Sequence, residues 1–199
     1  YYTNILEYDT RKEQLLELIS PVYADKYREN KRPEEALQEL AAGYLLRRFL
    51  GIDKENQISY LATGKPFLTT KDSLHFNLSH SGDYVALALS DSNVGVDLEK
   101  TGPVQEAVVK KVFPEEFRLE LEKADKDQRE ETYYSLWTRL EALLKLEGTG
   151  FVEDYKQVLA NHILNRTFTK SFALEDGYVL SVAGEAETEV TIHRVSPES

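Results

Sequence analysis

The chain has 199 residues, which is enough for one domain or for two small lobes that share a core. It contains no cysteine, so disulfides, thiolate nucleophiles and cysteine-ligated metals are excluded. The net charge of −11 argues against nucleic acid as a partner, because such binding relies on a basic surface. There is no membrane-spanning apolar run, and the first residues do not resemble a signal peptide. We therefore expect a cytoplasmic protein that binds no nucleic acid and no membrane.

The first eighty residues combine helical and extended patterns. A short strand is predicted near residues 3–8 and a long helix over 33–50, with a proline at its start and a glycine after its end. Gly43 lies inside this helix and suggests a close contact with a neighbouring element. A Gly-Lys-Pro turn at 64–66 and the strand HFNLSHS at 75–81 follow.

Residues 82–98 predict a β-hairpin. Tyr84–Leu89 and Val94–Leu98 have the composition of strands, and the turn residues Asp-Ser-Asn lie between them. Helical patterns then continue, with interruptions, to Lys145, and the last fifty residues return to strands.

These patterns predict an α+β fold of two similar lobes, each a small antiparallel sheet with helices. The segment GDYVALALS resembles the later segment DGYVLSVAG, which suggests pseudo-twofold symmetry. The N-terminal lobe, 1–98, would hold the Gly-Lys-Pro turn and the hairpin. The C-terminal lobe, 99–199, would hold the helix with WTRLEALLK and then antiparallel strands.

Two carboxylates lie two residues apart in the sequence VDLE. On a strand, Asp97 and Glu99 would project from the same face. Like charges held this close repel unless a cation lies between them, and the pair would suit a hard cation such as Mg²⁺. A solvent-facing pair at a strand end is the alternative.

A third carboxylate lies in the helical segment SLWTRLEALLK at 135–145. A helical wheel places Glu141 at the edge of the apolar arc, beside Trp137, with Lys145 one turn further on. The sequence alone favours an ordinary ion pair between Glu141 and Lys145, worth about 0.3–0.5 kcal/mol.

Polar and basic residues of the first half could contact an anion. Ser79 and His80 lie on the predicted strand 75–81. His80 shares the phase of the apolar residues, where a histidine is more often a satisfied, partly buried group than a ligand. Lys65 precedes a proline and projects from an extended turn, which suits a phosphate contact or an ordinary loop. Basic residues also cluster at Lys26–Arg32 and at Arg47–Arg48.

The motifs GKP, FNLSHS, GVDLE, WTRLEALLK and GTGF occur in this order between residues 64 and 151. This order resembles the 4′-phosphopantetheinyl transferases of the surfactin-synthetase type. Their motifs are a G-K-P turn, an (N/S)-(I/L)-S-H-(S/T) strand, a (V/I)-G-(V/I)-D-(I/L)-E strand and a (W/F)-(S/T)-x-K-E-(S/A)-x-x-K helix. GVDLE and W-x-x-x-E-A-x-x-K are together the most specific elements.

The resemblance implies two similar α+β lobes and a Mg²⁺-dependent reaction. The 4′-phosphopantetheine arm of coenzyme A would be transferred to a serine of an apo acyl or peptidyl carrier protein, with release of 3′,5′-ADP. Relatives of this length generally act alone, so the resemblance also implies a monomer.

The resemblance assigns roles to individual residues. Asp97, Glu99 and Glu141 would bind Mg²⁺, and Glu141 or a metal-bound water would accept the serine proton. Lys145 would face the pyrophosphate of coenzyme A.

The same resemblance assigns coenzyme A contacts to the first half of the chain. Ser79 and His80 would lie against its phosphates, Lys65 near the nucleotide and Lys26 at the 3′-phosphate. The basic residue Arg48 is a further candidate for these contacts.

The chain departs from the family pattern at Leu140, where relatives have a lysine before the glutamate. The helical wheel places Leu140 in the middle of the apolar arc, and Arg139 is a possible substitute for the missing charge. A degenerate relative that binds coenzyme A or a carrier protein without catalysis is therefore an alternative. An unrelated Mg²⁺-dependent phosphate enzyme, such as a phosphatase, is a third interpretation.

Overall fold

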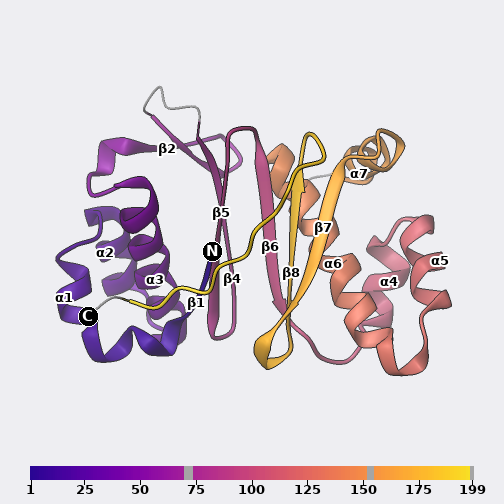
Figure 1. Ribbon diagram of the computed structural model, residues 1–199, viewed down its shortest axis with the longest axis horizontal. Helices are drawn as coiled ribbons and strands as arrows, with labels where there is room; N and C mark the ends of the chain where they lie inside the picture. Colours follow the sequence, from indigo (N-terminus) through magenta and orange to yellow (C-terminus); the bar gives the residue numbers. More distant parts are fainter. Residues whose placement is uncertain (70–73, 152–154, 198–199) are drawn as a thin grey trace. The chain divides into compact units, whose positions relative to one another are not determined.

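The computed structural model describes residues 1–69, 74–151 and 155–197, and the chain divides into two compact units. Unit 1 consists of Tyr1–Ser92 and Val190–Ser199, and unit 2 consists of Asn93–Glu189 (Figure 1). Each unit combines a three-stranded antiparallel sheet with helices, which confirms the predicted α+β class.

Unit 1 contains a helical layer and two small sheets. Its helices are α1 (Lys12–Leu16), α2 (Pro21–Glu29) and α3 (Pro33–Leu50), and its strands are β1 (Tyr2–Asn4), β2 (Ile58–Tyr60), β3 (Pro66–Leu68), β4 (His75–Ser81) and β5 (Tyr84–Ser90). The strands β1, β5 and β4 form one sheet in that order, and β2 and β3 form a hairpin around the predicted Gly-Lys-Pro turn. Helix α3 packs on β5, and their apolar side chains share one core. The predicted close contact at Gly43 is confirmed, since a Cβ there would lie 2.8 Å from the Cβ of Tyr23 on α2.

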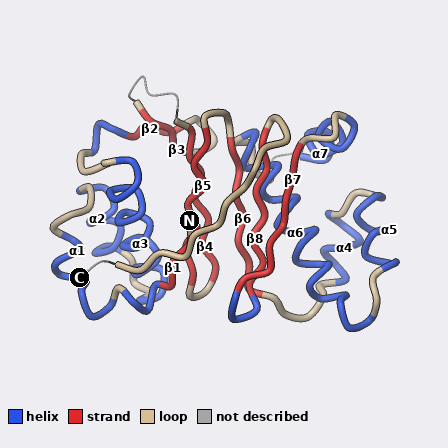
Figure 2. The backbone as a smooth tube through the Cα atoms, viewed as in Figure 1, coloured by secondary structure: helices blue, strands red, loops and turns tan. Residues whose placement is uncertain are grey.

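Unit 2 is built around one long helix that lies against its sheet (Figure 2). Its elements are β6 (Val94–Lys100), α4 (Glu106–Val112), α5 (Glu115–Lys123), α6 (Arg129–Glu147), α7 (Tyr155–Leu164), β7 (Phe168–Leu174) and β8 (Tyr178–Gly184). The sheet order is β6-β8-β7. Helix α6 packs along β6 and β8, and its apolar arc shares a core with residues of α4, α5 and α7.

The two units have the same chain topology. In each three-stranded sheet, one strand precedes the helices of the unit and two follow them, and the last of the three lies in the centre. The two similar segments noted in the sequence, 82–90 and 176–184, contain these two central strands, β5 and β8. The sequence similarity therefore reflects equivalent positions in two small sheets.

The structure corrects the predicted hairpin at 82–98. Strand β5 pairs with β4 and β1, whereas β6 pairs with β8, about eighty residues later in the chain. Strand β6 consequently belongs to unit 2, and the unit boundary falls at residues 92–93 instead of after residue 98. Residues 188–195, predicted as the last strand, form no strand, and from Val190 the chain belongs to unit 1, where Arg194 makes a single bridge to Tyr2.

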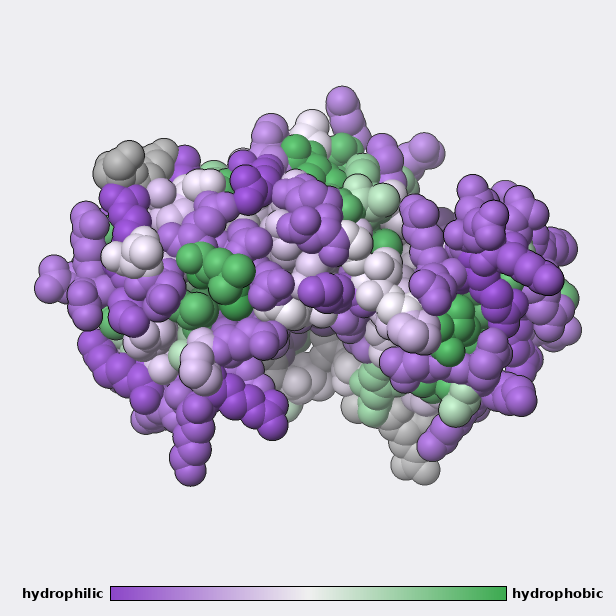
Figure 3. Space-filling view, turned by 90° about the horizontal axis from the view of Figure 1, so that it is seen from below, coloured by the Kyte–Doolittle hydropathy of each residue, from purple (hydrophilic) through white to green (hydrophobic). Residues whose placement is uncertain are grey.

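Hydrophilic side chains dominate the surface seen in Figure 3, and apolar side chains form only small patches there. The most exposed large apolar residues are Leu164 and Leu6. Within the described part of the chain, no helix has the length and apolar character that would let it cross a membrane.

Helix α6 approaches β6 so closely that one position of the strand has no room for a side chain. A Cβ on Gly95 would lie 2.0 Å from the carbonyl oxygen of Ala142 and 2.6 Å from the backbone nitrogen of Leu146. Both atoms belong to the helix backbone, so a side chain at Gly95 would push the helix away from the strand.

We predict that Gly95→Ala lowers the free energy of unfolding by about 2–3 kcal/mol, because the added methyl group meets helix backbone. Urea unfolding followed by circular dichroism measures this loss. Gly184→Ala is the matched control, since a Cβ there meets its nearest neighbours at 3.7 Å and 3.8 Å, ordinary contact distances. Equal stability of the two variants would contradict the close approach.

Candidate active site

The predicted carboxylates meet on the face of β6 that lies against α6. Asp97 and Glu99 are two residues apart on the strand, so both project from this face. On the facing helix, one row of side chains contains Trp137, Glu141 and Lys145. Trp137 bonds Glu99 and Lys145 bonds Asp97, and Glu141 is midway between Trp137 and Lys145 along the helix. Glu141 therefore lies between the level of Glu99 and the level of Asp97.

Asp97 is the buried end of this group, and its partner is a lysine. Its side chain is 6% exposed, and its Oδ1 accepts a hydrogen bond from Lys145 Nζ at 2.7 Å. The sequence alone had favoured Glu141, one turn away on the same helix, as the partner of Lys145. The structure gives the hydrogen bond to the more deeply buried strand carboxylate, where an ammonium interacts more strongly, while Lys145 still lowers the pKa of Glu141.

Glu99 is held by the only tryptophan of the sequence. The indole Nε1–H of Trp137 donates to Glu99 Oε1 at 3.4 Å. The indole ring is also stacked with the rings of Phe113 and Phe151. This aromatic stack fixes the ring that orients Glu99, a role that the sequence did not reveal.

Glu141 has a strongly raised pKa. Burial raises the pKa of its carboxyl, as do the negative charges of Asp97 and then Glu99, whereas Lys145 lowers it, and the result is a pKa of about 7. A carboxyl with this pKa exchanges protons near neutral pH, which suits a general base. It also shows that one ammonium does not balance the three carboxylates.

The donor atoms suit a hard divalent cation, but they are not assembled as a coordination shell. Carboxylate oxygens are preferred ligands of Mg²⁺, and a cation would relieve the repulsion that raises the pKa of Glu141. Within residues 1–69, 74–151 and 155–197, no three His, Cys, Asp or Glu side chains lie close enough together to hold an ion. A cation at this site would therefore have to draw the carboxylates together.

A chain of buried hydroxyl groups ties α6 to the middle of the sheet. Thr138 donates to the carbonyl oxygen of Tyr134 at 2.8 Å, so its oxygen must accept the bond that joins it to Ser181 at 2.7 Å. Ser181 in turn accepts from Ser171, also at 2.7 Å. Ser181 lies directly opposite Asp97 in the strand register, and Thr138 lies one turn before Glu141. The sequence hints at this chain only through hydroxyl residues within otherwise apolar runs.

In unit 1, three of the predicted coenzyme A contacts belong to elements that meet one another. The Lys26 ammonium lies 3.7 Å from Glu39 and 6.0 Å from the Tyr60 ring centroid. Tyr60 pairs with the proline that follows Lys65 in the β2–β3 hairpin. His80 is exposed near the end of β4. In the turn that follows β4, the carbonyl oxygen of Gly82 accepts a hydrogen bond from Gln38, the residue before Glu39 on α3.

The other two predicted contacts have different surroundings. Ser79 is buried, 4% exposed, and faces the opposite side of the sheet from the apolar row that contains His80. Arg48 lies nine residues beyond Glu39 on α3, about 13 Å along the helix axis, which separates it from Lys26. Its guanidinium donates to the carbonyl oxygen of Ser196 at 3.1 Å.

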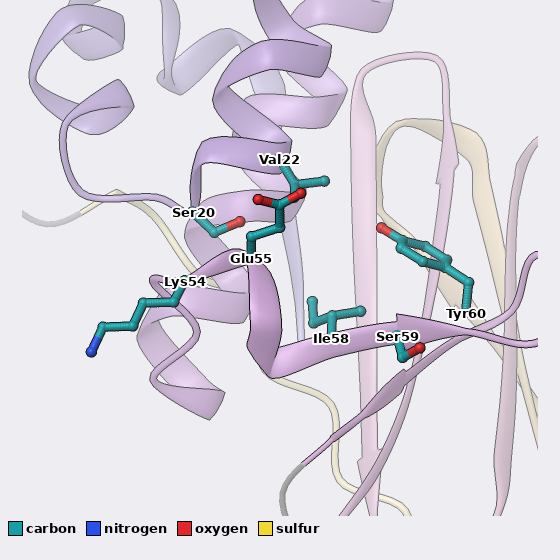
Figure 4. Close-up of a pocket in the computed structure, with 7 residues that line it drawn as sticks. All are labelled: Ser20, Val22, Lys54, Glu55, Ile58, Ser59 and Tyr60. Atoms are coloured by element: carbon teal, nitrogen blue, oxygen red, sulfur yellow. The ribbon is translucent and has the colours of Figure 1, made fainter.

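Unit 1 also contains a surface cavity of about 320 Å³ between the start of α2 and strand β2 (Figure 4). Figure 4 shows the Tyr60 hydroxyl and the Glu55 carboxylate turned toward this space, while the Lys54 ammonium points away from it. The lining residues are Ser20, Val22, Lys54, Glu55, Ile58, Ser59 and Tyr60. None of the predicted coenzyme A contacts is among them.

Leu140 is a core residue, as the helical wheel predicted. It is fully buried and belongs to the apolar core of unit 2. Arg139, the possible substitute for the family lysine, forms an ion pair with Glu120 at 3.1 Å and lies over the Phe117 ring. The guanidinium is therefore already engaged by α5.

Residues 93–187, which make up nearly all of unit 2, match the sequence model of the 4′-phosphopantetheinyl transferase superfamily. Through this segment the chain belongs to that superfamily. The resemblance inferred from the sequence motifs is thereby confirmed. The carboxylates, Trp137 and Lys145 all lie within the matched segment.

Individual relatives agree with this assignment. The chain is 32% identical over 143 residues to the 4′-phosphopantetheinyl transferase Sfp of Bacillus subtilis, a match that covers 69% of this chain and 64% of Sfp. It is 38% identical over 87 residues to the transferase psf-1 of Bacillus pumilus (44% of this chain, 37% of psf-1). It is 39% identical over 95 residues to the transferase AcpT of Escherichia coli K12 (46% and 49%). The chain spans less than two thirds of the length of each of these relatives.

We predict that Glu141 makes the metal-free protein less stable as the pH rises from about 4.5 to about 7. The folded state binds the proton more tightly than the unfolded state in this interval, so deprotonation favours unfolding. Glu141→Gln should remove this decline and stabilise the protein at pH 8 by on the order of 1–2 kcal/mol. Urea unfolding in EDTA between pH 4 and pH 8 measures the effect. Glu122→Gln, an exposed change on α5, is the control and should keep the wild-type slope.

We predict that Thr138→Val lowers the free energy of unfolding by about 1–3 kcal/mol, because the buried Ser181 hydroxyl loses its acceptor. Thr138→Ser keeps the hydroxyl and should cost less, despite the loss of a methyl group. Thermal unfolding of both variants tests the role of the hydroxyl chain. A larger loss in Thr138→Ser would show that the methyl group matters more than the hydrogen bond.

Proposed function

We propose that this protein transfers the 4′-phosphopantetheine arm of coenzyme A to a serine of an apo acyl or peptidyl carrier protein and releases 3′,5′-ADP. The observation that carries the proposal is the group of Asp97, Glu99, Glu141 and Lys145 between β6 and α6. This group lies in the segment that matches the superfamily, and its members occupy the motif positions GVDLE and W-x-x-x-E-A-x-x-K.

The reaction requires a base for the serine and positive charge for the leaving group. The serine oxygen forms a bond to the phosphorus of the arm, and the bond from that phosphorus to the 3′,5′-ADP oxygen breaks. Glu141 would accept the serine proton as the general base. The Lys145 ammonium would stabilise negative charge on the pyrophosphate.

Asp97, Glu99 and Glu141 would hold a Mg²⁺ ion in this proposal. When bound, the ion would supply charge that stabilises the transferring phosphate and the leaving group. The excess of carboxylates over ammonium groups at the site, reflected in the raised pKa of Glu141, supports this role.

The coenzyme A contacts predicted in unit 1 also belong to the proposal. Lys26, Lys65 and His80 are the stronger candidates, because they belong to elements that meet near Tyr60 and Glu39. Ser79 and Arg48 stay in the proposal as candidate contacts. We further propose that the protein acts as a monomer in the cytoplasm, in keeping with its lack of cysteine.

Leu140 favours a second candidate function, binding of coenzyme A or a carrier protein without catalysis. The family lysine is replaced here by a fully buried leucine, and the adjacent Arg139 is engaged by Glu120. Tight coenzyme A binding without transfer to any of several apo carriers would support this candidate over the enzyme.

We predict that an apo carrier protein gains the mass of the arm when mixed with coenzyme A, Mg²⁺ and this protein, and that EDTA prevents the gain. Asp97→Ala and Glu141→Ala should each reduce the rate by at least about 100-fold, because each removes a proposed metal ligand. Mass spectrometry of a panel of apo carriers measures transfer. Glu122→Ala, an exposed change on α5, should leave the rate unchanged. Undiminished transfer by both active-site variants would refute the assigned roles.

A further inference from the structure

The ion pair between Asp97 and Lys145 occupies a carboxylate that the proposed function needs for a metal. Lys145 Nζ lies 2.7 Å from Asp97 Oδ1, within hydrogen-bond distance. A divalent cation bound to the same oxygen would face the ammonium at only a few ångströms, where like charges repel strongly in a partly buried site. The ammonium and the metal therefore compete for Asp97.

The two partners of this ion pair differ in their freedom to move. The Asp97 side chain is 6% exposed, and it is fixed on the edge strand of a sheet beneath α6. The Lys145 side chain is 29% exposed and lies in the last turn of α6, where its flexible stem can carry the ammonium into solvent. Displacement of the pair would thus move the lysine and leave the carboxylate in place.

We propose, on the basis of the function proposed above, that Lys145 is the resident counter-ion of Asp97 in the metal-free protein and that an incoming divalent cation displaces it. The displaced ammonium becomes available to a phosphate oxygen of coenzyme A. Lys145 would thereby couple metal binding to phosphate binding, because its positive charge reaches the phosphate only after the metal has taken over Asp97.

The absence of an assembled metal shell among the described residues agrees with this exchange. A lysine whose role was only structural would support the metal site, and its loss would weaken both metal and coenzyme A binding. A displaced counter-ion has the opposite effect on the metal.

The test measures Mg²⁺ binding by isothermal titration calorimetry in the absence of coenzyme A. Lys145→Met should bind Mg²⁺ about tenfold more tightly than wild type, because the competing cation is gone. Lys110→Met, an exposed change on α4 of the same unit, removes the same charge and should stay within about twofold of wild type. Coenzyme A binding at saturating Mg²⁺ should weaken in Lys145→Met only.

A second variant tests the exchange if Lys145→Met does not fold without metal. Lys145→Arg keeps the ion pair and adds donors that suit a carboxylate, so it should bind Mg²⁺ more weakly than wild type. Mg²⁺ binding that is unchanged or weaker in a folded Lys145→Met, or unchanged in Lys145→Arg, overturns the exchange, as does a wild-type protein that binds no Mg²⁺.

The same variants separate this inference from the proposed function. If the wild-type protein modifies a carrier but all variants bind Mg²⁺ equally, the exchange is wrong and the transferase function stands. If no carrier is modified but Lys145→Met still binds Mg²⁺ more tightly, the exchange stands and the transferase function is wrong.

Discussion

The close contact between α6 and β6 is the constraint on which the rest of unit 2 depends. Gly95 lets the helix backbone lie directly on the strand, with no side chain between them. That contact brings the row of Asp97 and Glu99 within reach of the stripe that contains Glu141 and Lys145. A helix held further away by an ordinary side chain would leave these charges in solvent, where their interactions are weak.

The contact also gathers three carboxylates and one lysine side chain at the site. Two carboxylates raise the pKa of a third, and the single lysine among them is paired with the most buried one, Asp97. The surrounding hydroxyl chain and aromatic stack are neutral, so they fix the geometry without supplying charge. Such a site favours a bound proton or cation. Repulsion among its carboxylates lowers the stability of the protein when no cation is bound.

Helix α6 both packs in the core of unit 2 and presents charged side chains to β6, and it uses a different face for each. Leu140 and its apolar neighbours fill the core on one side, while Glu141 and Lys145 project beside the strand carboxylates on the other. At position 140 packing has prevailed over charge, because a lysine there would bury an ammonium in an apolar core. The positive charge that α6 presents to the strand carboxylates is thus that of Lys145.

The sequence by itself determined whatever depends on short spacing. The interval of two between Asp97 and Glu99 put both carboxylates on one strand face, and helical periodicity identified Leu140 as a core residue. Longer pairings depended on the tertiary structure. The turn-forming residues before Val94 suggested a hairpin, but β6 pairs with β8, and the face of β6 with Gly95, Asp97 and Glu99 lies against α6. Likewise Lys145 had a carboxylate one turn away, yet it pairs with Asp97, because burial in the folded unit makes that more distant residue the stronger partner.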